Sequence, residues 1–156
     1  YRYSYENVLI IILKKKTNYK LKSIKIKKPL INFSFKKLKK DQTLIYNKIK
    51  KIIYKGYKVC LFGTGHVACT FIKMLELSDL IDLVVDDNKK KFGMYLPNLN
   101  CKIKKSKELK KYNKLLIILG VNSESEKKII KELIKINSSI KFCSVYNNSD
   151  YSFRNL

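Results

Sequence analysis

The sequence predicts an α/β fold in which helices flank a parallel β-sheet. Short apolar runs alternate with amphipathic helical patterns over most of the chain, and a glycine-containing turn stands between one such run and the following helix. The composition is 46% hydrophobic, which supplies enough apolar side chains for a buried sheet. With 156 residues, the chain has room for one ordinary domain and a short extra piece.

The first helix is expected to begin at Asp41, which can act as its N-cap, and to end at Gly56, which can adopt the left-handed conformation common at helix ends. The apolar residues between these ends recur at helical spacing: Leu44, Ile45, Ile49, Ile52 and Ile53. An amphipathic helix therefore precedes the sheet.

The first two strands are expected at Lys58–Phe62 and Ile81–Val85, because both runs are short and apolar. The helix between them carries an apolar stripe of Val67, Phe71, Met74 and Leu75. The second strand leads directly into Asp86 and Asp87.

Two further strands are expected at Lys114–Leu119 and Ile140–Val145, with a short helix at Ser106–Lys111 before them. The helix between these strands is expected to open with a capping box, in which Ser123 and Glu126 each accept a hydrogen bond from a backbone N–H. This alternation predicts about four parallel strands in the order 2-1-3-4.

The N-terminal part differs in composition. Asn7–Leu13 is apolar and rich in β-branched residues, which predicts a buried strand, and Lys14–Lys40 carries twelve lysines and no acid around Pro29. We therefore divide the chain into a terminal strand region at residues 1–16, a basic linker at 17–40, an α/β domain at 41–147 and a tail at 148–156.

The candidate site lies between the first strand and its helix. Gly63-Thr64-Gly65-His66-Val67-Ala68 matches G-x-G-x-x-A, and Asp86 follows Gly65 by 21 residues at the end of the second strand. In a Rossmann-like fold, these glycines bring backbone amides at a helix N-terminus close to a diphosphate, and an acid accepts hydrogen bonds from ribose or sugar hydroxyls. The alternative is that the glycines form only a tight turn and that Asp86 and Asp87 are solvated.

Two other residues are candidates for ligand contact. His66 is the only histidine and stands where the helix begins, so it either contacts phosphate or packs. Asn122 follows the third predicted strand, across the crevice in which ligands of such sheets bind. No Ser or Cys lies near an evident base, so we expect no catalytic nucleophile.

The formal charge of +23 favours an anionic partner, but only Arg2 and Arg154 are arginine, and nucleic-acid sites depend on arginine. We interpret the lysines as solvated surface and expect no specific nucleic acid and no membrane. The four cysteines form no C-x-x-C pair, which predicts free thiols, no metal site and a cytoplasmic protein.

Several segments together resemble the C-terminal domain of S-adenosylmethionine-dependent sugar C-methyltransferases. The resemblance covers about residues 41–147 and is carried by Val59–His66, Cys69–Ile72, Ile81–Asn88, Lys91–Gly93 with Leu96-Pro97, and Asn122–Glu126. Lys89, Asn98 and Lys102 depart from the family, which often has proline or glycine there.

The resemblance implies a parent enzyme with a cysteine-rich zinc region, a central domain that binds S-adenosylmethionine, and this α/β domain, which packs on the central domain and places a nucleotide-diphosphate sugar. It implies that the zinc region and most of the methyl-donor site are missing, that Tyr3–Leu13 is the last strand of the central domain, and that this chain alone is not catalytic. The residues expected near the sugar nucleotide are Gly63, Thr64, Gly65, His66, Asp86, Asp87, Asn88 and Asn122.

Two other functions are compatible with the sequence. The glycine motif also fits a stand-alone module that binds NAD(H), coenzyme A or another nucleotide without catalysis. The segment Lys14–Lys58, with seventeen lysines and one acid, fits a module for nucleic acid or an anionic membrane surface.

Overall fold

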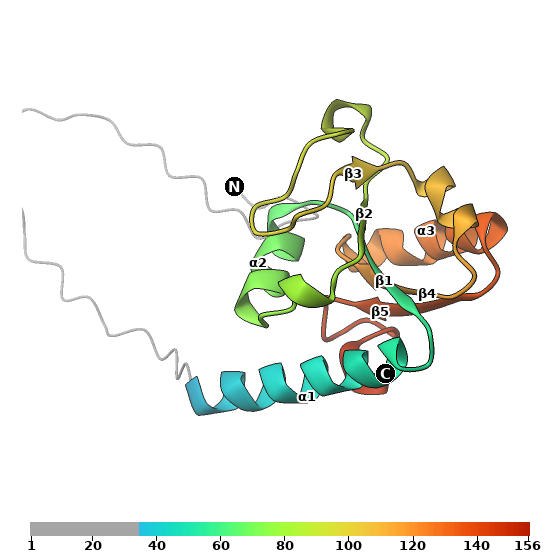
Figure 1. Cartoon of the computed structure of the whole chain (residues 1–156). Helices are drawn as coiled ribbons and strands as arrows, with labels where there is room; N and C mark the ends of the chain where they lie inside the picture. The colour runs from blue at the N-terminus through green and yellow to red at the C-terminus, as the bar shows by residue number, and fades with distance from the viewer. Residues whose placement is uncertain (1–34) are drawn as a thin grey trace, which may run out of the picture. The chain divides into compact units, whose positions relative to one another are not determined.

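A five-stranded parallel sheet forms the centre of residues 35–156, the part of the chain that this computed structural model describes (Figure 1). The strand order is β3-β2-β1-β4-β5, and all four neighbouring pairs are parallel. The strands are β1 (Lys58–Phe62), β2 (Leu83–Val85), β3 (Ile103–Lys104), β4 (Leu115–Leu119) and β5 (Ile140–Ser144). The strand expected at Asn7–Leu13 lies outside the described residues.

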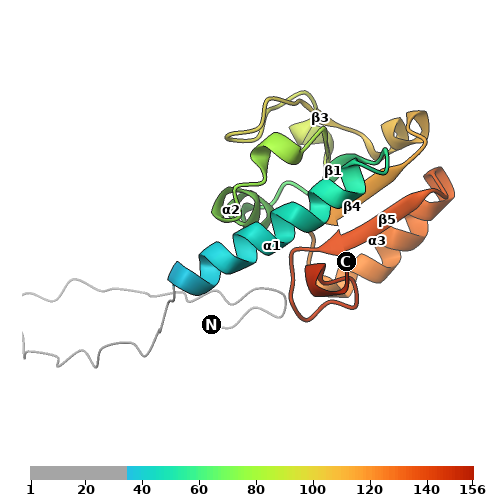
Figure 2. The same cartoon turned by 60° about the horizontal axis from the view of Figure 1, so that its bottom comes forward.

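Helices cover both faces of this sheet. The longer ones are α1 (Phe35–Ile53), α2 (His66–Met74) and α3 (Ser123–Ile136), and the short 3-10 helices are η1 (Ser78–Leu80), η2 (Lys89–Lys91), η3 (Ser106–Lys111) and η4 (Phe153–Asn155). Residues of α1 and α2 share one core cluster, while residues of α3 and η3 share another. The sheet therefore separates α1 and α2 from α3 (Figure 2).

The two central strands explain why the sheet is parallel. Every residue of β4 is buried, and in β1 only the first residue is exposed. Strands that are apolar on both faces require helices on both sides, and such sheets are parallel in α/β proteins. The core therefore extends through both helical layers.

The predicted strand order is confirmed for four strands, because the order 2-1-3-4 corresponds to β2-β1-β4-β5. The predicted number of strands is corrected to five by β3, which pairs with β2 at the edge of the sheet. With two residues, Ile103 and Lys104, β3 is too short to produce a periodic pattern in the sequence.

The first helix begins at Phe35 instead of Asp41. Its first residues belong to the lysine-rich segment that we expected to be a linker, and lysine is a good helix former where its side chain reaches water. The absence of an apolar stripe over Phe35–Lys40 concealed this start.

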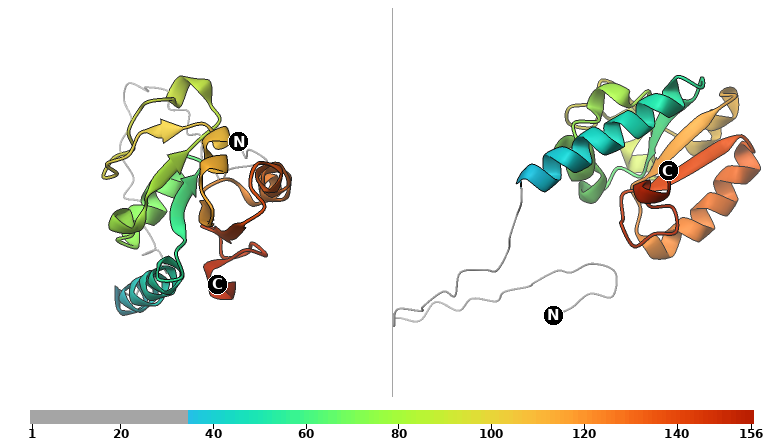
Figure 3. Two further views of the ribbon diagram at one scale, coloured as in Figure 1. Left: turned by 45° about the vertical axis from the view of Figure 1, so that its right-hand side comes forward. Right: turned by 90° about the horizontal axis from the view of Figure 1, so that it is seen from below.

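The C-terminal residues 148–156, expected as a tail, pack against α1 and α2. Phe153 is only 4% exposed, and its ring stacks on Phe71 of α2 with centroids 5.3 Å apart. Lys48 Nζ of α1 donates hydrogen bonds of 3.0 Å to the backbone oxygens of Phe153 and Arg154. These contacts hold the C-terminal segment beside α1 (Figure 3).

The predicted capping box is wrong. Asn122 is the N-cap of α3, and its Oδ1 accepts a 3.1 Å hydrogen bond from the N–H of Ser125. Glu126 is instead 3% exposed and accepts short hydrogen bonds from the hydroxyls of Ser144 and Ser149. The S-x-x-E pattern is present in the sequence, but the Glu126 carboxylate binds residues after β5 and does not cap α3.

The Ser144 and Ser149 hydroxyl oxygens in turn accept hydrogen bonds of 3.0 Å from the N–H groups of Tyr146 and Tyr151. A buried carboxylate thus organises the whole turn that follows β5. Buried polar groups are stable only when such partners satisfy them.

Cys60 and Cys143 are free thiols, as predicted; both are fully buried, and burial raises the pKa of both. No helix within residues 35–156 is long and apolar enough to cross a membrane. The same residues contain no group of three or more His, Cys, Asp or Glu side chains that could hold a metal ion.

Candidate functional site

The loop after β1 turns sharply at Gly63. Its φ is +88°, a left-handed conformation that other residues rarely adopt, and its N–H donates a 2.8 Å hydrogen bond to the carbonyl of Val85 at the end of β2. A Cβ on Gly63 would lie 2.8 Å from Val121 Cγ1 and 3.1 Å from the Gly120 oxygen. The first glycine of the motif is therefore required by both conformation and space.

The loop after β4 lies against this turn. The N–H of Gly120 donates a 2.8 Å hydrogen bond to the carbonyl of Phe62, and a Cβ on Gly120 would come within 2.5 Å of Ala68 Cβ. The expected juxtaposition of these two loops at the carboxyl edge of the sheet is confirmed. Ala68, the small last position of the motif, permits this approach.

The N-terminus of α2 has no side-chain cap. Gly65 is the N-cap residue, with φ −75° and ψ 167°, and nothing lies within 4 Å of the position that its Cβ would occupy. The backbone N–H groups of residues 65–68 have no acceptor within the described part of the chain. By contrast, Asn122 caps α3, so its Oδ1 is already used.

Asp86 joins the two loops that carry the predicted site. Its Oδ2 accepts hydrogen bonds from Thr64 N at 2.9 Å, Thr64 Oγ1 at 2.5 Å and Lys91 Nζ at 2.9 Å. Its Oδ1 accepts a 2.9 Å bond from the N–H of Asn88. A carboxylate has about four lone-pair sites, so the protein itself occupies most of this acceptor.

These contacts determine the ionisation of Asp86. Partial burial would raise its pKa, but the hydrogen bonds from Thr64, Lys91 and Asn88 outweigh that effect and lower the pKa from 3.8 to about 2. The side chain is 13% exposed, so solvent screens these contacts little. The ionised Asp86 therefore connects the loops that follow β1 and β2.

Asp86→Asn should remove this charge-dependent stabilisation. Because the folded-state pKa is depressed, the stabilisation is present above the unfolded pKa and is lost as the pH falls toward about 2. The difference in unfolding free energy between wild type and variant should shrink by about 2 kcal/mol between pH 5 and pH 2. Urea denaturation across this range measures it.

Asp150→Asn serves as the control, since Asp150 makes only a 3.8 Å ion pair and is 78% exposed. The difference in unfolding free energy between Asp150→Asn and wild type should stay nearly constant over the same pH range. An Asp86→Asn curve parallel to that of wild type would contradict the assigned role.

The other predicted residues at the end of β2 also have local partners. Asp87 Oδ1 accepts a 2.9 Å hydrogen bond from the N–H of Ser106, and Asn88 Oδ1 accepts a 3.1 Å bond from the N–H of Lys90. Both side chains are exposed, as is His66 at the start of α2. Their contact with a ligand stays a prediction.

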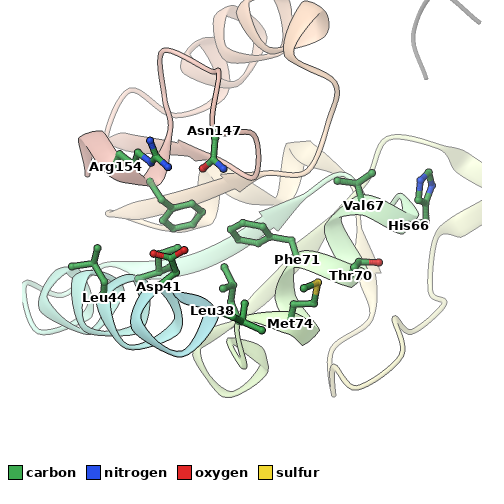
Figure 4. Close-up of a pocket in the computed structure, with 13 residues that line it drawn as sticks. Leu38, Asp41, Leu44, His66, Val67, Thr70, Phe71, Met74, Asn147 and Arg154 are labelled. Carbon is green, nitrogen blue, oxygen red and sulfur yellow. The ribbon is translucent and has the colours of Figure 1, made fainter. Parts of the chain in front are cut away.

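A groove of about 450 Å³ opens beside the glycine loop, between α1, α2 and the C-terminal segment (Figure 4). His66 and Val67 lie at one end of the groove, and Asp41 and Arg154 line it farther along α1 (Figure 4). Except for His66, sequence reasoning assigned no binding role to its lining. The one sequence signal for a binding role was Arg154, because the chain has only two arginines, Arg2 and Arg154, beside 33 lysines.

A family model described as "C-methyltransferase C-terminal domain" matches residues 11–140. No curated protein matches the chain. The matched range includes every predicted site residue from Gly63 to Asn122 but ends before the C-terminal wall of the groove.

Proposed function

Because the chain belongs to the C-methyltransferase C-terminal domain family, we propose that residues 35–156 bind and position a nucleotide-diphosphate sugar for methylation at carbon. One observation carries this proposal, namely the uncapped N-terminus of α2 beside the glycine turn. The open space at Gly65 lets a phosphate oxygen approach the backbone, and the unpaired N–H groups and the helix dipole favour a dianion.

The neighbouring residues would hold this anion site in shape. Gly63 makes the turn, while Asp86 fixes the loop through both the backbone and the hydroxyl of Thr64. Because a preformed loop loses little conformational entropy on binding, its affinity for the diphosphate is higher. The imidazole of His66 is exposed at the same helix end, which supports a contact with the phosphates.

S-adenosylmethionine would supply the methyl group in the parent enzyme. Asp86, the acid at the place where the ribose of its adenosine would bind, is already largely occupied by Thr64, Lys91 and Asn88. We therefore place the methyl donor on the methyltransferase domain of the parent protein and propose that this unit packs on that domain.

Gly65→Asp should weaken diphosphate binding without harming the fold. An aspartate at the N-cap would accept hydrogen bonds from the N–H groups of α2 and repel an anion, while its Cβ meets no atom within 4 Å. The affinity for a nucleotide-diphosphate sugar should fall at least about tenfold, or 1.4 kcal/mol, while thermal stability stays unchanged or rises slightly.

Calorimetric titration of the full chain with dTDP-glucose, UDP-glucose and GDP-mannose at about 0.15 M salt measures this, since salt at that level screens unspecific attraction to the lysines. Gly65→Ala is the control for the added Cβ, which enters the space that a phosphate oxygen would use but brings no acceptor and no charge, so its affinity should lie between those of wild type and Gly65→Asp. If Gly65→Asp binds as tightly as wild type, the helix N-terminus is not the anion site.

A further inference from the structure

The groove in Figure 4 is continuous with the proposed diphosphate site. His66 follows the glycine loop directly and also lines the groove, which then runs along Val67, Thr70 and Phe71 of α2. A molecule whose phosphates sit on the N-terminus of α2 therefore has the groove within reach of one end.

The groove has an apolar floor and a polar rim. In the floor, the half-buried Phe71 stacks on the buried Phe153 with an interplanar angle of 23°. Asp41, Asn147 and Arg154 line the groove, and their side chains have no hydrogen-bond or ion-pair partner among residues 35–156. Apolar cavities of about 300–1,000 Å³ with a few convergent polar groups are typical sites for small molecules.

Resting on the proposed function, we infer that this groove holds the nucleobase of the sugar nucleotide. A base is flat and apolar on its faces, which suits an aromatic floor, and its edge carries both donors and acceptors. The Asn147 amide offers both kinds of group, the Arg154 guanidinium offers donors, and the Asp41 carboxylate offers acceptors. An acyl chain would leave all three of these rim groups unused.

The position of the rim bears on specificity. Asn147 and Arg154 lie beyond the residues that the family model matches, on the segment held by Lys48. Two of the three rim residues thus lie outside the matched range, whereas Asp41 lies within it.

Thr70→Met tests the inference, because it places a neutral, flexible side chain in the groove from an exposed position on α2. The full chain is titrated with dTDP, UDP, GDP and inorganic pyrophosphate at about 0.15 M salt. At least one nucleoside diphosphate should bind wild type about tenfold or more tightly than pyrophosphate does. Thr70→Met should reduce that affinity to the pyrophosphate level and leave pyrophosphate binding unchanged.

Thr43→Met is the matched control, since Thr43 is exposed on α1 but does not line the groove, and it should bind like wild type. Asn147→Ala provides a second variant, which should weaken nucleoside diphosphate binding alone. If wild type binds nucleoside diphosphates no better than pyrophosphate, or Thr70→Met keeps the wild-type affinity, the groove does not hold the base although the diphosphate site stands. Binding of neither ligand would overturn the proposed function, and this inference with it.

Discussion

Gly120→Ala should destabilise the folded unit by about 2–3 kcal/mol, although it adds a single methyl group. The new Cβ would lie 2.5 Å from Ala68 Cβ and 2.8 Å from the carbonyl oxygen of Gly63. The second of these neighbours is backbone in a left-handed turn, so it cannot move without disturbing the loop. The cost therefore includes displacement of β4 or α2.

Gly65→Ala is the matched comparison for Gly120→Ala, because it also adds a single methyl group to a glycine near the Gly63 turn. Its Cβ would meet nothing within 4 Å, so its free energy of unfolding should fall by at most about 1 kcal/mol, the cost of alanine at an N-cap. Urea denaturation of the two variants measures both values. Equal stability of Gly120→Ala and Gly65→Ala would show that the two loops are less closely packed than described.

Glu126→Ala should lower the free energy of unfolding by about 3 kcal/mol or more, because it removes the acceptor of two buried hydroxyls. Ser144 and Ser149 are 1% and 8% exposed, and each already accepts a hydrogen bond from a backbone N–H. Without the carboxylate, their hydroxyl hydrogens have no buried partner. The turn after β5 should loosen, and amide hydrogen exchange at Tyr146 and Tyr151 should become faster.

Glu124→Ala is the control for helix and charge effects, since Glu124 stands in the same first turn of α3 but is exposed. It should cost at most about 0.5–1 kcal/mol through the helix dipole. Glu126→Gln retains one acceptor and should fall between wild type and Glu126→Ala. The assignment of Glu126 fails if Glu124→Ala and Glu126→Ala are equally stable.

The pattern of apolar residues predicted the central elements because each of them is buried along most of its length, and burial requires apolar side chains. Lys58–Phe62 is apolar on both faces and is found as β1 with the predicted bounds. β3 escaped prediction because its conformation depends on its neighbours, whereas the first turns of α1 did so because Phe35–Lys40 has no apolar stripe. Ile103 and Lys104 become a strand only because β2 offers a free edge.

The candidate site shows the same division. The turn at Gly63 and the open N-terminus of α2 follow from the order of residues along the chain, because strand, glycines and helix are consecutive. The connection formed by Asp86 was not predictable in detail, since it requires Lys91 to fold back from η2. The burial of Glu126 likewise depends on Ser149, 23 residues away in sequence.

The hydrogen bonds from Lys48 to the backbone oxygens of Phe153 and Arg154 have a consequence for biosynthesis. They connect positions separated by 105 and 106 residues, so they close after nearly the whole unit has been translated. Chain closure over such a separation is slow, and it comes last when translation proceeds from the N-terminus. Until Phe153 and Arg154 have left the ribosome, the groove beside α1 and α2 therefore lacks one wall.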